Sequence, residues 1–125
     1  MKRLARWRRG RRVEPGDEIR QAIAAGNAAR DVGDWTGAVA RYERALALDP
    51  ANAAVRMQLG HGLKALGRVA EAETAYRTAA SVRPDDPDIE VQIGHVLKLQ
   101  GRLDDALDAY ERAQANDPAP PPARD

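Results

Sequence analysis

Apolar side chains recur along the chain every three or four residues, the spacing at which they share one side of a helix. Two such runs lie next to each other in the middle of the sequence. They are Val55, Leu59, Leu63 and Leu66, followed by Val69, Ala72, Tyr76 and Ala79. Extending the pattern over the whole chain predicts helices near residues 17–32, 35–48, 53–66, 69–82, 87–100 and 103–116.

Residues that end or begin helices lie between these runs. Gly67 and Arg68 separate the two central runs, and glycine can take the left-handed conformation that ends a helix. Asp86 precedes Pro87 and Asn52 precedes the third predicted helix, so both are expected N-caps. The helices are therefore predicted to form tight antiparallel pairs.

The composition favours helices over strands. The chain has no phenylalanine and only 4% aromatic residues, whereas strands favour aromatic and β-branched side chains. It also has no cysteine, which excludes disulfides and thiolate metal sites. We therefore predict an all-α fold.

The clearest pattern is a repeat of 34 residues. Six columns recur three times at this period: Gly26/Gly60/Gly94, Gly33/Gly67/Gly101, Ala38/Ala72/Ala106, Tyr42/Tyr76/Tyr110, Ala45/Ala79/Ala113 and Pro50/Pro84/Pro118. The repeat divides residues 17–118 into three units, 19–52, 53–86 and 87–120. One helix pair cannot bury its apolar face alone, so the units are expected to stack around a shared core.

These columns resemble the tetratricopeptide repeat (TPR) family. Its pattern places small residues, an aromatic residue and a proline where the middle unit has Gly60, Ala72, Ala79, Tyr76 and Pro84. The usual tryptophan at position 4 is absent, since Ala22, Arg56 and Glu90 stand there. The resemblance implies a right-handed superhelical stack of three hairpins, an α-solenoid, that serves as a protein-binding scaffold and is not an enzyme.

In this family the first helix of each pair lines a concave groove. When this family pattern is applied to the present chain, each unit contributes a cation and an Asn or His to the groove. Gln and apolar residues lie beside them. The predicted partner-binding residues are Asn27, Arg30, Met57, Gln58, His61, Lys64, Val91, Gln92, His95 and Lys98. This set suits a protein or peptide partner of acidic character. The alternative is that the cation row only keeps the surface hydrated.

Other kinds of site are disfavoured. The clamp by which some TPR co-chaperones hold a terminal carboxylate needs basic residues where this chain has Ile23, Asp88 and Gln92. His61 and His95 lie one repeat apart, and packed helices are about 8–10 Å apart, too far for one zinc ion to bond both. No catalytic motif is present. We predict no catalytic residue, no metal and no cofactor.

Charge is distributed unevenly between the start of the chain and the rest. Residues 1–12 hold seven of the 20 cations and no acid, which leaves 13 cations against 19 acids elsewhere. The arginines and the tryptophan of this arm, taken as residues 1–16, are Arg3, Arg6, Trp7, Arg8, Arg9, Arg11 and Arg12. Such an arm can contact an anionic membrane or nucleic acid, or be a solvated leader. We expect a cytoplasmic protein, or one peripheral at the inner membrane face.

The C-terminal part suggests two further interpretations. Leu103 and Leu107 are predicted to leave a small apolar patch that supports a weak homodimer or docks on a partner, before a proline-rich tail, 119–125. Separately, the segments Gly60–Arg68 and Gly94–Arg102 resemble TPR arrays that front bacterial glycosyltransferases. On that interpretation the chain is an accessory or stand-alone relative of such an enzyme.

Overall fold

The structure, a computed structural model, describes residues 14–117. Within this range the chain forms six helices and no strand. They are α2 (Pro15–Asp31), α3 (Trp35–Leu48), α4 (Ala53–Ala65), α5 (Val69–Val82), α6 (Pro87–Leu99) and α7 (Leu103–Ala115). The all-α prediction is confirmed, and every helix boundary lies within two residues of the expected one.

The largest boundary difference is at the start of α2. This helix begins at Pro15, not at residue 17, so the predicted limit of the basic arm at residue 16 falls inside it. The Glu14 carbonyl accepts hydrogen bonds from the backbone N–H groups of Asp17 and Glu18, at 2.8 and 3.1 Å. Proline suits the first helical position because no helical partner is needed for its missing N–H.

The turns and caps are those that the sequence indicates. Gly33, Gly67 and Gly101 close the three hairpins with φ of 79°, 79° and 76°, a conformation that costs glycine little. The Asn52 side chain accepts a hydrogen bond from Val55 N–H at 3.1 Å, and Asp86 accepts one from Asp88 N–H at 3.0 Å. Both predicted N-caps are confirmed.

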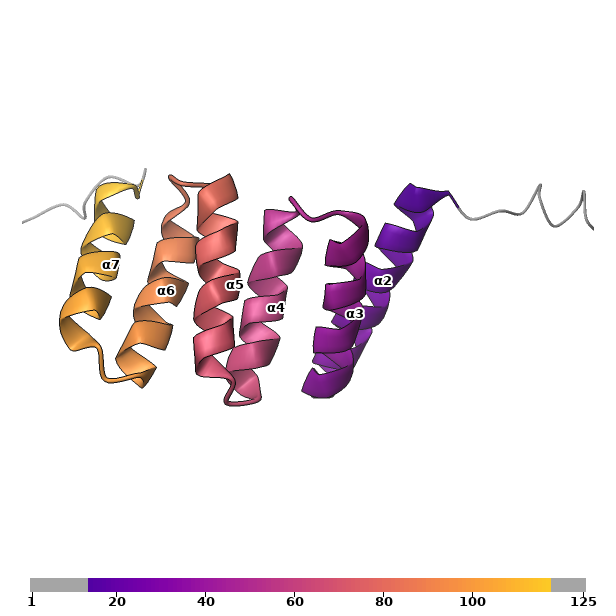
Figure 1. The fold of residues 1–125 in the computed structure, drawn as a ribbon, viewed down its shortest axis with the longest axis horizontal. Helices are drawn as coiled ribbons and strands as arrows, with labels where there is room; N and C mark the ends of the chain where they lie inside the picture. Colours follow the sequence, from indigo (N-terminus) through magenta and orange to yellow (C-terminus); the bar gives the residue numbers. More distant parts are fainter. Residues whose placement is uncertain (1–13, 118–125) are drawn as a thin grey trace, which may run out of the picture.

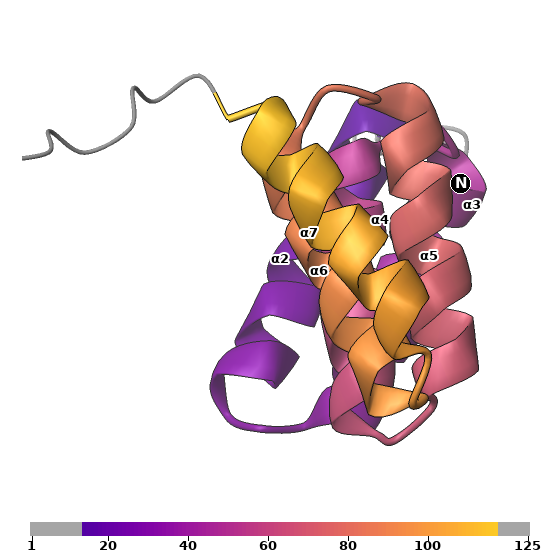
Figure 2. The same cartoon turned by 90° about the vertical axis from the view of Figure 1, so that its left-hand side faces the viewer.

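The helices are arrayed in chain order along the long axis of the molecule (Figure 1). Extensive contacts join only neighbours in sequence, first within each hairpin and then between one hairpin and the next. Seen from the end in Figure 2, α2 and α6 lie toward one side and α3 and α5 toward the other. Each unit therefore depends on the units directly beside it.

The core of each hairpin is built on the contact between its glycine and its tyrosine. A Cβ atom added at Gly26 would lie 2.6 Å from the Tyr42 ring, and one at Gly94 would lie 2.5 Å from the Tyr110 ring. Gly60 and Tyr76 make the same contact. Tyr42 and Tyr76 are fully buried, whereas Tyr110 in the last unit is half-buried.

Polar contacts reinforce the junction between the second and third units. Glu73 of α5 accepts hydrogen bonds from Gln100 and Arg102, both at 2.9 Å, and pairs with Arg77 of its own helix at 2.8 Å. Burial alone would raise the pKa of Glu73, but the hydrogen bonds from Gln100 and Arg77 and the charges of Arg77 and Arg102 outweigh it, so the pKa is lowered. This carboxylate is therefore held ionised between two hairpins.

Candidate functional site

A row of polar side chains runs along the first helices of the three hairpins, α2, α4 and α6. We call this row the first-helix face and define it by Asn27, Arg30, Gln58, His61, Lys64, Gln92, His95 and Lys98. Arg30 Nη1 donates to Gln58 Oε1 at 3.2 Å, and one repeat later Lys64 Nζ donates to Gln92 Oε1 at 3.1 Å. The cation of one unit is thus bonded to the glutamine of the next, which aligns these side chains across unit boundaries.

The tyrosine hydroxyls orient the Asn and His column from behind. Tyr42 Oη donates to Asn27 Oδ1 at 2.7 Å, and Tyr76 Oη lies 2.6 Å from His61 Nδ1. In the third unit the His95 and Tyr110 rings meet edge to face, with centroids 5.8 Å apart. The same tyrosine that fills a hairpin core therefore also supports the residue that faces outward.

The protonation of His61 follows from this contact. Burial raises the pKa of Tyr76, so the phenol keeps its proton. Tyr76 is fully buried and His61 Nδ1 is the acceptor that its hydroxyl meets within residues 14–117, so the phenol is assigned as the donor. The pKa of His61 is lowered, first by burial and then by the charges of Lys64 and Arg30. A neutral His61 that accepts at Nδ1 carries its proton on Nε2, and so offers a donor.

The cations of the first-helix face differ in their partners. Arg30 is paired with Asp31 at 2.9 Å. Within residues 14–117, Lys64 and Lys98 make no ion pair, and burial lowers the pKa of Lys64. The charges of Lys64 and Lys98 also lower the pKa of His95, after burial, which places both cations near that ring. The uncompensated positive charge of this face therefore lies in its second and third units.

The two apolar residues predicted for the same site lie in different surroundings. Met57 is partly buried and packs against the core. Val91 is half-buried and lines a shallow hollow with Pro87, Asp88 and Tyr110 at the C-terminal end. The basic arm, Arg3 to Arg12, lies outside the described residues, so its suggested contacts with membrane or nucleic acid stay predictions.

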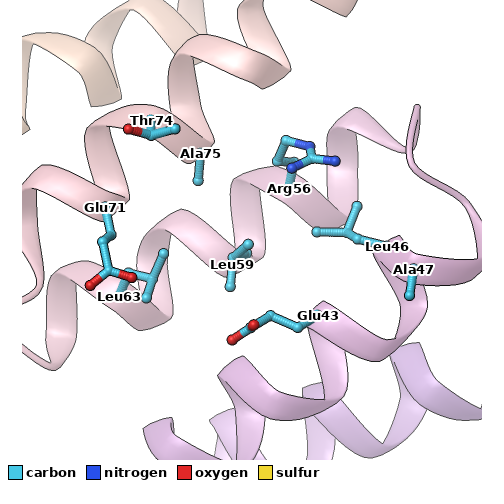
Figure 3. Close-up of a pocket in the computed structure, with 9 residues that line it drawn as sticks. All are labelled: Glu43, Leu46, Ala47, Arg56, Leu59, Leu63, Glu71, Thr74 and Ala75. Atoms are coloured by element: carbon cyan, nitrogen blue, oxygen red, sulfur yellow. The ribbon is translucent and has the colours of Figure 1, made fainter.

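A cleft on the second-helix side was not foreseen from the sequence. It has a volume of about 430 Å³ and lies between α3, α4 and α5, with Leu46, Leu59 and Leu63 inside it and charged residues around it (Figure 3). One repeat later the equivalent hollow is smaller, about 250 Å³, and is lined mainly by charged residues. There Arg102 pairs with Glu73 at 2.9 Å across the junction between hairpins, and Arg112 pairs with Glu90 at 3.1 Å within the third hairpin. The difference arises from which side chains meet in space, and a repeat alignment alone does not show it.

No group of three His, Cys, Asp or Glu side chains in the described range is placed to hold a metal ion. No helix within residues 14–117 has the length and hydropathy needed to cross a bilayer.

Comparison with known proteins settles the family. A sequence profile described as tetratricopeptide repeat matches residues 29–93, and a second profile of the same description matches residues 91–122. The first covers more than half of the chain. The chain belongs to the tetratricopeptide repeat family. TPR units are typically non-catalytic modules for protein–protein interaction, and this chain has the fold of such a scaffold.

Solved structures with the same arrangement include MamA and a TPR domain of Spaghetti. A point mutant of MamA is 27% identical over 82% of this chain and 75% of its own, with a TM-score of 0.77. A second MamA structure, from AMB-1, is also 27% identical, with a TM-score of 0.75. The match covers 82% of this chain and 60% of that MamA chain.

The second TPR of Spaghetti (RPAP3), bound to the HSP90 peptide SRMEEVD, shares the fold alone. It is 20% identical, with a TM-score of 0.75, and covers 80% of this chain and 93% of its own. No curated protein matches the chain.

Proposed function

We propose that this TPR scaffold binds an acidic segment of a partner protein on its first-helix face. The observation that carries the proposal is the pair of cations at Lys64 and Lys98, which have no ion pair within residues 14–117. Lys64 is half-buried, so a carboxylate that approached it would meet a charge already partly removed from water.

The neighbouring groups support the same ligand chemistry. His61 offers an N–H donor at Nε2, and the Asn27 amide keeps its NH₂ group available because Tyr42 and Arg30 both bond to its oxygen, at 2.7 and 3.4 Å. Donors and cations on one face favour carboxylates and backbone carbonyls as partners. Two acids lie beside this row within residues 14–117: Asp31, which is paired with Arg30, and the exposed Asp88, four residues before Gln92 on α6.

The test is a charge reversal in the full chain with a matched control. Lys64→Glu with Lys98→Glu is compared with Arg41→Glu and Arg83→Glu, two exposed arginines outside the first-helix face, so both double variants change the net charge equally. Partners are captured from cells of the source organism with each form as bait. We expect the first double variant to lose a partner that the parent and the control retain.

The captured partner then allows a direct measurement. Peptides from its acidic segments are titrated against the parent, together with versions in which Asp and Glu are replaced by Asn and Gln. We expect replacement to weaken binding at least about tenfold, and added salt to weaken the acidic peptide more than its neutral version. Equal loss of capture in both double variants, or equal binding of acidic and neutral peptides, would contradict the proposal.

A further inference from the structure

The third unit leaves apolar side chains uncovered where the stack ends. Leu103 and Leu107 lie four residues apart on α7, on one side of the helix, and are 61% and 53% exposed. The sequence predicted this patch. What the structure adds is the role that these two positions have in the other units.

In the first unit the equivalent residues, Trp35 and Val39, pack against the first helix of the next unit. The backbone of Gly62 in α4 comes so close that an added Cβ would lie 2.8 Å from Val39 Cγ2 and 3.9 Å from the Trp35 ring. In the second unit Glu73 stands at the position of Val39 and bonds to Gln100 and Arg102 of the next hairpin. Leu103 and Leu107 therefore form the surface on which a following first helix would pack.

We propose that α2 of a second copy of this chain packs on Leu103 and Leu107 and so continues the stack from one molecule to the next. Ala28 of α2 stands at the repeat position of Gly62, and Val32 stands at that of Leu66. Ala28 is exposed where Gly62 is buried, and Val32 is 81% exposed where Leu66 is 37% exposed, so α2 leaves open a surface that α4 largely covers. The small side chain at Ala28 allows a close approach of the kind that Gly62 makes.

One substitution makes this junction weaker than those inside the molecule. Gln21 is exposed, whereas Val55 and Ile89 at the same repeat position are buried. Less apolar surface is thus removed from water when α2 packs on α7 than when α4 packs on α3. Association is accordingly expected to depend on protein concentration.

Charge favours a head-to-tail arrangement over a symmetric one. Of the exposed acids of α7, Asp105 pairs with Arg102 at 3.4 Å, whereas Asp104, Asp108 and Glu111 make no ion pair within residues 14–117. Arg112, the cation of this helix, is already paired with Glu90. A contact between two α7 helices would bring these acids together, whereas α2 carries both signs, with Arg20 and Arg30 on the same helix as Asp17, Glu18 and Asp31. Because the two contacting surfaces differ, each copy can add another, and the assembly does not close.

The experiment blocks one surface at a time in the full-length chain. Leu107→Glu gives the third unit the residue that the second unit has at this position, and Ala28→Glu places an anion on the exposed side of α2, so that the two blocked surfaces also repel each other. Ala40→Glu and Val82→Glu are the matched controls, since both residues are exposed and lie away from the two ends. Sedimentation velocity follows the size of each protein, and of mixtures, as concentration rises.

We expect the parent and both controls to grow continuously past the size of a dimer. Each blocked variant alone should need at least about tenfold more protein to associate, because a charge would be buried without a partner. An equimolar mixture of the two blocked variants retains one intact pair of surfaces, so it should form a dimer and nothing larger. The proposal is overturned if the parent stays monomeric at millimolar concentration, if Ala28→Glu alone still dimerises, or if the mixture stays monomeric. None of these variants changes Lys64 or Lys98, so this experiment tests self-association separately from the proposed binding of an acidic segment.

Discussion

At the residue scale, one tyrosine column links the core to the surface. Tyr42 and Tyr76 are fully buried, yet their hydroxyls reach Asn27 and His61 on the first-helix face. Asparagine in the first unit and histidine in the second accept the same hydrogen bond. The two residue types are therefore structurally interchangeable at this position while they differ in their response to pH.

This difference yields a prediction about acid stability. Folding lowers the pKa of His61 from its ordinary 6.5, so below about pH 6.5 the unfolded chain binds a proton that the folded chain resists. The contribution of His61 to stability is therefore complete above pH 6.5 and is lost as the pH falls toward the lower folded value. We expect His61→Asn to lose less stability than the parent between about pH 7.5 and pH 5, measured by urea unfolding.

Asn27 accepts a hydrogen bond from Tyr42 in the first unit, so an asparagine at position 61 should accept the one from Tyr76. The parent and His61→Asn should therefore unfold at similar urea concentrations at about pH 7.5. An identical loss of stability on acidification in both would show that His61 does not carry the effect.

At the scale of the elements, each hairpin is held by the close approach of its two helices. The glycine of the first helix meets the tyrosine ring of the second with no room for a Cβ atom, and this is repeated three times. Because the ring is buried and the glycine belongs to a helix backbone, neither partner can move away easily.

Gly60→Ala is therefore expected to destabilise the protein. In an open helix this change would be favourable by up to about 1 kcal/mol, but here the added methyl group meets the Tyr76 ring. We expect a loss of about 1–3 kcal/mol in the free energy of unfolding, measured with urea. Gly16→Ala is the matched control, because its added Cβ would contact only the flexible Arg20 side chain at 3.4 Å, and it should be neutral or stabilising. Similar effects of both changes would rule out the proposed crowding.

At the scale of the whole molecule, the fold is a line of units in which each helix contacts mainly its neighbours in sequence. The middle unit is supported on both sides and the outer units on one. Tyr110, half-buried where Tyr42 and Tyr76 are fully buried, shows this loss of cover at the C-terminal end. Stability in such a stack is expected to fall toward its ends.

Amide hydrogen exchange of the native protein tests this gradient. At low protein concentration, where end-to-end packing is absent, we expect the amides of α4 and α5 to exchange most slowly, and those of α7 at least about tenfold faster. Local opening of the last hairpin breaks one junction between units, whereas opening of the middle hairpin breaks two. Uniform protection along the chain would instead indicate a single cooperative unit.

The sequence by itself determined the helices, their turns and their number. The 34-residue period, the turn glycines and the caps at Asn52 and Asp86 are local features, so they can be read from neighbouring residues. Even the glycine and tyrosine columns, one of each per hairpin, follow from the period. The hydrogen bond between Lys64 and Gln92 does not follow from the period, because it depends on the distance between side chains on successive hairpins.

Only the tertiary structure decided which surfaces stay open. The cleft beside Leu59 and Leu63 and the smaller, charged hollow beside Leu97 occupy equivalent places in the repeat, and their difference depends on side chains from three helices. Leu103 and Leu107 have apolar counterparts in the first unit, but their exposure follows from the end of the stack and not from their own chemistry. Local sequence fixes backbone conformation, whereas the exposure of a side chain depends on what packs beside it.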